Sequence, residues 1–94
     1  MTQPLQDKIA LVTGASRGIG RAIAEKLAAN GATVIGTATS ENGASAISDY
    51  LSDSGTGMVL NVSEAESVEQ LLAAIKEQYG DVDILVNNAG ITRD

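Results

Sequence analysis

Four short apolar runs constrain the fold of this chain more than any other feature. They cover residues 9–12, 33–37, 58–60 and 84–86. The runs are continuous rather than alternating with polar residues, which is typical of strands covered on both faces, as in a parallel sheet. Parallel strands need crossovers of a dozen or more residues, and each gap here is long enough to hold a helix.

Each of the three segments between these runs has apolar residues at helical spacing. The first helix is predicted over 19–29, where apolar residues recur every fourth position and Asn30-Gly31 supplies a left-handed C-cap. A weaker pattern predicts the second helix over 44–51. The third follows a capping box at Ser63–Glu66 and ends before Gly80; its apolar positions are Val68, Leu71, Leu72 and Ile75.

The order β-α-β-α-β-α-β predicts an α/β fold, the first half of a Rossmann-type doubly wound parallel sheet with strand order 3-2-1-4. Residues 1–94 would form the N-terminal segment of a single domain. A fourth strand buried on both faces needs further elements beside it, so we expect this half-sheet to be incomplete. The alternative is a complete four-stranded miniature.

Composition excludes several classes of function. There are 12 acidic and 6 basic residues, so the formal net charge is −6, which argues against binding to nucleic acid or an anionic membrane. The absence of Cys and His excludes disulfides, thiolate chemistry, His-based triads and zinc-finger patterns, and we predict no metal site. Because neither a signal peptide nor a membrane-length apolar run is present, we expect a soluble, cytoplasmic protein.

A glycine-rich motif, TGASRGIG at 13–20, lies between the first strand and the first helix. Gly14 would let the chain turn sharply, Gly18 would let the backbone approach a diphosphate, and Gly20 would let the helix pack on the sheet. The N–H groups and positive dipole end of the helix would face the anion. The spacing G-x-x-x-G-x-G differs from the commoner G-x-G-x-x-G, and a tight turn without a ligand is the alternative.

The end of the second strand predicts NADP(H) rather than NAD(H). An NAD site places a carboxylate there to accept from the ribose 2′-hydroxyl, but the residues GTATS contain no acid. Thr39 could donate to a 2′-phosphate, and Arg17 could contact it. We interpret Glu41 as a solvated residue at a helix entry, and Arg21 as the ion-pair partner of Glu25.

The glycine motif together with Asn87–Gly90 resembles the short-chain dehydrogenase/reductase family, over about Lys8 to Asp94. More narrowly, Gly36–Glu41 and Asn88–Asp94 are similar to the bacterial 3-oxoacyl-(acyl-carrier-protein) reductases of fatty-acid synthesis.

The resemblance implies a residue set for the cofactor. The diphosphate and adenosine side would be held by Gly14, Ala15, Ser16, Arg17, Gly18, Ile19 and Gly20, with Thr39 near the 2′-phosphate. The adenine would meet Asn61 and Val62; the family usually has Asp at the first of these positions, but an amide oxygen can also accept from the adenine amino group. The ribose and nicotinamide side would be lined by Asn88, Ala89, Gly90 and Ile91, whereas Asn87 would tie strand ends together.

The family also uses a Tyr-x-x-x-Lys pair and a Ser to reduce the carbonyl, with Tyr donating a proton. Here Tyr50 is followed four residues later by Ser54 and Tyr79 by Asp83, so neither tyrosine forms the pair. We therefore predict no catalytic residue within these 94 residues and expect Tyr79 to pack at the core or its rim.

Three functions follow from this reasoning. The favoured one is NADPH-dependent reduction of 3-oxoacyl-acyl-carrier-protein in fatty-acid biosynthesis, by a homotetramer assembled through regions beyond residue 94. The first alternative is a short-chain reductase of other specificity, for acetoacetyl-CoA, a sugar or a steroid. The second is a non-catalytic nucleotide-binding fragment.

Overall fold

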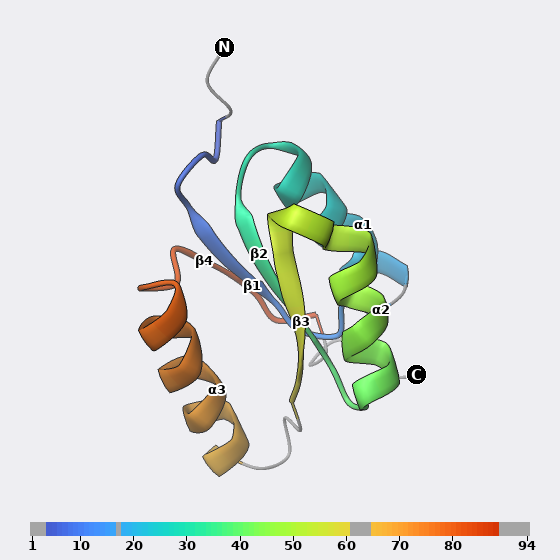
Figure 1. The fold of residues 1–94 in the computed structure, drawn as a ribbon, viewed down its shortest axis with the longest axis vertical. Helices are drawn as coiled ribbons and strands as arrows, with labels where there is room; N and C mark the ends of the chain where they lie inside the picture. Colours follow the sequence, from blue (N-terminus) through green and yellow to red (C-terminus); the bar gives the residue numbers. More distant parts are fainter. Residues whose placement is uncertain (1–3, 17, 61–64, 89–94) are drawn as a thin grey trace.

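Four parallel strands form one sheet in the order β3-β2-β1-β4, and helices lie against both of its faces (Figure 1). The computed structural model describes residues 4–16, 18–60 and 65–88. In chain order the elements are β1 (Ile9–Val12), α1 (Gly18–Ala29), β2 (Thr33–Ala38), α2 (Glu41–Leu51), the 3₁₀ turn η1 (Ser52–Ser54), β3 (Gly55–Val59), α3 (Ala65–Gln78) and β4 (Ile84–Val86). The predicted Rossmann-type topology and strand order are confirmed.

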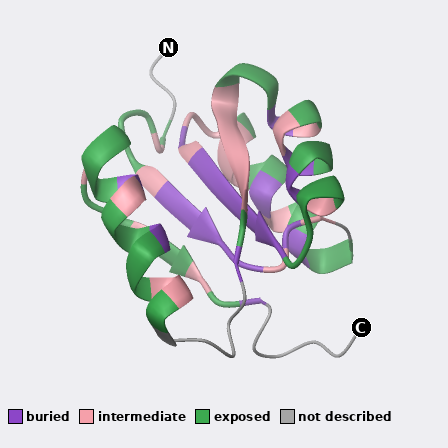
Figure 2. Cartoon of the chain, turned by 60° about the horizontal axis from the view of Figure 1, so that its bottom comes forward, coloured by how far each residue is buried: buried purple, intermediate pink, exposed green. Residues whose placement is uncertain are grey.

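The two faces of the sheet have separate cores. On one face α1 and α2 pack against alternate residues of β1 and β2; the fully buried members are Ala10, Val12, Ala15, Ala24, Val34 and Ile47. On the other face α3 packs through Leu71 and Ile75 onto Leu11 and Ile35. Both central strands are therefore buried on both faces, as their continuous apolar runs predict (Figure 2). None of the helices in the described ranges is long and apolar enough to cross a membrane.

The first helix ends as its sequence predicts. Gly31 follows the last turn with a φ of 99°, in the left-handed region that glycine adopts without strain. Its N–H donates to the Ala28 carbonyl at 3.0 Å, and the Ala32 N–H donates to the Leu27 carbonyl at 3.1 Å. These bonds satisfy carbonyls that the helix itself leaves without partners.

The second helix begins three residues earlier than predicted, at Glu41 rather than Ala44. Ser40 is its N-cap, and the Ser40 Oγ accepts from the Gly43 N–H at 3.2 Å. The pair Asn42-Gly43 conceals this start because both residue types disfavour helix interiors. Glu41 is exposed in the first turn, as expected for a helix-entry carboxylate.

The prediction of the third strand over 58–60 was wrong at both ends, since β3 covers Gly55–Val59. The glycines at its start suggest a loop, but a Cβ on Gly57 would meet the backbone of Ala44 in α2, with the Ala44 carbonyl carbon 2.8 Å away. The Gly57 N–H also donates to Ser48 Oγ of α2 at 2.9 Å. Gly57 therefore allows α2 to approach β3 closely, and it does not end the strand.

Only the two central strands are covered on both faces, and the exposure of β4 agrees with the expectation that the half-sheet is incomplete. In the described residues β3 is half-buried, and Leu85 of β4 is 64% exposed (Figure 2). The physical reason is that α3 packs over Leu11 and Ile35 of the central strands and leaves β4 uncovered on that face. The capping box predicted for the third helix lies partly outside the described residues, because it includes Ser63.

Replacing Gly57 with Ala is expected to lower the free energy of unfolding by about 1–3 kcal/mol, because the added methyl group must displace the backbone of α2. Chemical denaturation of the two proteins measures the difference. The control is Ser45→Ala, at an exposed position of the same helix, which should change stability little. Equal unfolding free energies for Gly57→Ala and wild type would show that the α2–β3 approach is not close.

Candidate functional site

The carboxyl ends of β1, β2 and β4 meet at one edge of the sheet, where the glycine-rich loop leads from β1 into α1. This edge, beside the switch in strand order, is where open α/β sheets bind ligands. Gly14 and Gly18 both have a φ of 64°, a left-handed conformation that side chains disfavour. The motif thus makes the sharp turn that its glycines predict.

Strand β2 holds the first two amides of the loop. The Gly14 N–H donates to Thr37 Oγ1 at 3.3 Å, and the Ala15 N–H donates to the Thr37 carbonyl at 2.8 Å. Thr37 is 2% exposed, so this contact is shielded from water. The amides of Gly14 and Ala15 are therefore hydrogen bonded within the protein, and they shape the loop.

The end of β4 holds the loop from the opposite side. Thr13 Oγ1 donates to Asn87 Oδ1 at 3.2 Å, and Asn88 Nδ2 donates to the Gly14 carbonyl at 3.1 Å. Asn87 therefore ties the ends of β1 and β4 together, as predicted. Asn88, predicted for the nicotinamide side, is buried and supports the loop, a contact that its family role did not indicate.

Two glycines of the motif have opposite surroundings. A Cβ on Gly20 would collide with the Gly14 carbonyl oxygen and lie 2.7 Å from Asn88 Nδ2, so α1 packs closely against the loop. A Cβ on Gly18 would meet no atom within 4 Å among the described residues. Gly18 thus adjoins open space at the start of α1, and Ile19 beside it is 65% exposed. A ligand could approach the helix N-terminus there.

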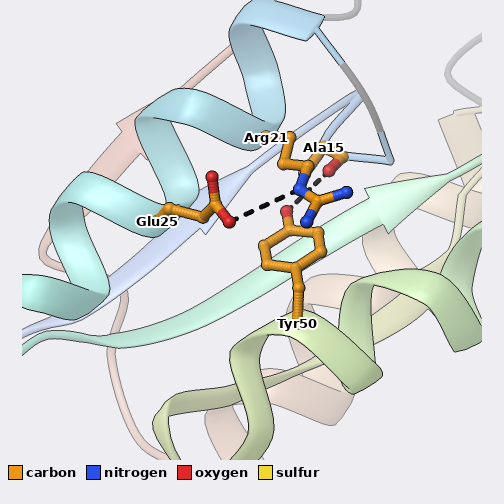
Figure 3. Close-up of polar contacts among 4 residues, drawn as sticks. All are labelled: Ala15, Arg21, Glu25 and Tyr50. Carbon is orange, nitrogen blue, oxygen red and sulfur yellow. Dashed lines mark hydrogen bonds and ion pairs between the residues drawn. The ribbon is translucent and has the colours of Figure 1, made fainter.

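Tyr50 connects α2 to the loop (Figure 3). Its hydroxyl donates to the Ala15 carbonyl at 2.6 Å. Arg21 of α1 lies over the Tyr50 ring, 4.6 Å from the guanidinium carbon to the ring centroid, and pairs with Glu25 at 3.4 Å. Burial, reinforced by the Glu25 carboxylate and opposed by Arg21, raises the pKa of Tyr50 to about 12. The phenol is therefore neutral and able to donate at physiological pH.

The predicted ion pair between Arg21 and Glu25 is confirmed, and Thr39 is exposed just beyond the end of β2, beside the N-cap Ser40. Ser16 is half-buried in the loop. The remaining predicted site residues lie outside the described residues: Arg17, Asn61, Val62, Ala89, Gly90 and Ile91. Tyr79, predicted to pack at the rim, follows α3 and is 38% exposed.

A cavity of about 400 Å³ opens near the ends of β1 and β4, on the face that α3 covers. Its lining is apolar apart from Thr13 and Asn87; the other lining residues are Leu11, Leu60, Val68, Leu71, Leu72 and Leu85. Within residues 4–16, 18–60 and 65–88, no group of three or more acidic, His or Cys side chains could hold a metal ion.

The contacts of Thr37 and Tyr50 with the loop were not predicted from the sequence. Thr37 is a β-branched residue within a strand, so its pattern indicated only strand structure. Tyr50 lies 35 residues from Ala15, and its hydroxyl meets the loop only because α2 packs beside α1. The one available signal was a tyrosine near the apolar stripe of a helix, where a hydroxyl needs a partner.

Comparison with known proteins shows which family the chain matches. The short chain dehydrogenase family model matches residues 8–94. The chain is 70% identical over 90 residues to the 3-oxoacyl-(acyl-carrier-protein) reductase FabG of Haemophilus influenzae, covering 96% of this chain and 37% of that protein. The FabG proteins of Escherichia coli and Pseudomonas aeruginosa are 71% and 57% identical, over 95% and 96% of this chain and 36% and 38% of their own lengths. The chain therefore spans little more than a third of the length of these relatives.

Replacing Asn88 with Asp is expected to lower the free energy of unfolding at neutral pH by about 1–3 kcal/mol, because a buried acceptor would face the Gly14 carbonyl. Acidification should restore part of this loss, since burial raises the pKa of the introduced carboxyl and its protonated form can donate again. Denaturation at several pH values measures both effects. The control is Asn87→Asp, which retains an acceptor for Thr13 at an exposed position. Equal losses of unfolding free energy in Asn88→Asp and Asn87→Asp would contradict the hydrogen bond from Asn88 to the Gly14 carbonyl.

Proposed function

Because the chain belongs to the short chain dehydrogenase family, we propose that it is the cofactor-binding part of an NADPH-dependent 3-oxoacyl-(acyl-carrier-protein) reductase. Relatives of that name from Haemophilus influenzae and Vibrio cholerae are 70% and 71% identical to it, each over 96% of its length. The substrate would be a 3-oxoacyl group carried on acyl carrier protein. NADPH, when bound, supplies the hydride that converts the 3-oxo group to a 3-hydroxyacyl thioester.

The single observation that carries this proposal is the shape of the glycine-rich loop. Its turn is fixed by hydrogen bonds from β2, α2 and β4, and no other described residue fills the space beside Gly18 at the N-terminus of α1. No acidic residue lies in the first turn of α1, so no side-chain charge there opposes an anion. The loop and helix end therefore fit a diphosphate, held through Ser16, Arg17 and the residues 18–20.

The end of β2 supports NADP(H) over NAD(H). The strand ends at Ala38, and neither Thr39 nor Ser40 brings a carboxylate to the position of the adenosine ribose. Glu41, the nearest acid along the chain, is in the first turn of α2 and exposed. We propose that Thr39 and Arg17 contact the 2′-phosphate, that Asn61 and Val62 contact the adenine, and that Asn88, Ala89, Gly90 and Ile91 line the nicotinamide side.

The remaining features of the protein are part of the same proposal. The proton donor and its lysine would lie outside these 94 residues, since neither tyrosine is followed by lysine four positions on. We propose a cytoplasmic homotetramer assembled through regions beyond this segment. The net charge of −6 favours neither nucleic acid nor an anionic membrane as a partner.

The protein that contains this segment is expected to oxidise NADPH when given a 3-oxoacyl thioester, and the 94-residue chain alone is not, because it lacks the proton donor. Absorbance of NADPH in both preparations measures the two activities. Failure of the full-length protein to oxidise NADPH with acetoacetyl-acyl-carrier-protein would overturn the proposed function. Turnover by the short chain would show that its catalytic residues have been misplaced.

In the full-length protein, Thr39→Asp is expected to shift preference from NADPH toward NADH. The new carboxylate would repel a 2′-phosphate and accept from a 2′-hydroxyl, and a charged hydrogen bond of about 1.5–3 kcal/mol corresponds to at least a tenfold change in the ratio of the two kcat/KM values. Steady-state kinetics with each cofactor measure the ratio. Thr39→Ser, which keeps the hydroxyl, should retain the preference for NADPH. An unchanged ratio in Thr39→Asp would place Thr39 away from the ribose.

A further inference from the structure

The contact between Tyr50 and the loop joins two parts of the chain that the proposed function does not otherwise connect. Tyr50 lies in the last turns of α2, 35 residues beyond the loop, and its hydroxyl reaches the Ala15 carbonyl at 2.6 Å (Figure 3). Ala15 is fully buried, so water does not readily replace this donor. The hydrogen bond is short and shielded, which makes its loss costly to the local geometry.

We propose that Tyr50 is a positioning residue for the cofactor site, whose hydroxyl holds the Ala15 peptide in the orientation that binds the diphosphate. The inference rests on the proposed NADP(H) site and adds a residue that forms no part of the glycine motif. Tyr50 would act through the loop without touching the cofactor.

The geometry of the peptide bond gives the reason. In a trans peptide the carbonyl and the following N–H point in opposite directions. Because the Ala15 carbonyl points at Tyr50 on α2, the Ser16 N–H points away from α2. The N–H groups of Gly14 and Ala15 already donate to Thr37. Tyr50 therefore sets the direction of the next amide in the loop, that of Ser16.

The ring of Tyr50 is itself held from two sides. It packs against the buried cluster that includes Ala15, Ala24 and Ile47, while Arg21 of α1 covers its outer face. Glu25 pairs with Arg21 one helical turn on and keeps the guanidinium over the ring. A ring fixed in this way presents its hydroxyl in one position, and so can orient the carbonyl it contacts.

The protonation state of Tyr50 suits this role. Burial raises its pKa to about 12, so the hydroxyl stays protonated at neutral pH and well above it. A phenolate could not donate to the Ala15 carbonyl and would repel it. The positioning hydrogen bond is thus insensitive to pH near neutrality.

The test is Tyr50→Phe in the full-length protein, since it removes the hydroxyl and keeps the ring with its packing and its contact to Arg21. We expect the Kd for NADPH to rise about three- to tenfold, the effect of losing one net hydrogen bond. The KM for NADPH should rise in proportion, while kcat at saturating NADPH stays within about twofold. Enhancement of NADPH fluorescence on binding gives Kd, and steady-state kinetics give the other two constants.

The matched control is Tyr79→Phe, which removes a hydroxyl from the more exposed tyrosine after α3 and should leave all three constants unchanged. Kd is measured well below the melting temperature of each variant, so that a change in stability does not alter it. An unchanged Kd in Tyr50→Phe overturns the proposal, whether or not the melting temperature falls. A Tyr50→Phe protein that does not fold also overturns it, because the hydroxyl would then support the fold rather than the loop.

The proposed function and this inference fail in different ways. Wild-type protein that binds no NADPH refutes the cofactor assignment, whatever the variants do. Wild-type protein that binds NADPH, with Tyr50→Phe binding equally well, leaves the cofactor assignment in place and removes only the role of Tyr50.

Discussion

The structure depends on the close approach of Gly20 to the Gly14 carbonyl. No side chain fits between them, so α1 can lie this near the end of β1 only because position 20 is glycine. Asn88 donates to the same carbonyl from the end of β4. The turn, α1 and the end of β4 therefore meet at the Gly14 carbonyl oxygen. The same contacts shape the edge of the sheet where a ligand would bind.

Some backbone groups of the loop are hydrogen bonded within the protein, and the groups that follow them adjoin the edge of the sheet where a ligand would bind. The amides of Gly14 and Ala15 donate to Thr37, and their carbonyls accept from Asn88 and Tyr50. These four groups are used in holding the turn, so an anion would have to be bound by groups that follow them, from Ser16 into the first turn of α1. A loop that is already fixed in this way loses less conformational entropy when a ligand binds, so less of the binding free energy is lost to ordering.

The sequence predicted β1, β2 and β4 well, and it predicted β3 and the start of α2 less well, for physical reasons. Continuous apolar runs mark β1 and β2 because both of their faces are buried, and Gly31 marks the end of α1 because the chain turns left-handed there. Gly57 and Asn42-Gly43 resemble loop residues in sequence, and only the packing of α2 on β3 explains them. The contacts of Thr37 and Tyr50 with the loop cross 22 to 35 positions, so local pattern could not reveal them.

The placement of charge explains why the shape of the loop matters so much here. Three of the described cations, Lys8, Lys26 and Lys76, lie before β1 or in the last turns of α1 and α3, at the edge of the sheet opposite the loop. Arg21 is at the correct edge, but Glu25 offsets its charge and the Tyr50 ring holds it. Among the described residues, a dinucleotide would therefore find few free positive side chains. Backbone N–H groups at a helix end can bind an anion in their place, but hydrogen bonds depend on direction more steeply than charges do. Backbone N–H groups that bind an anion must therefore be held rigidly, so in the proposed function the residues that hold the loop matter as much as those that would touch the ligand.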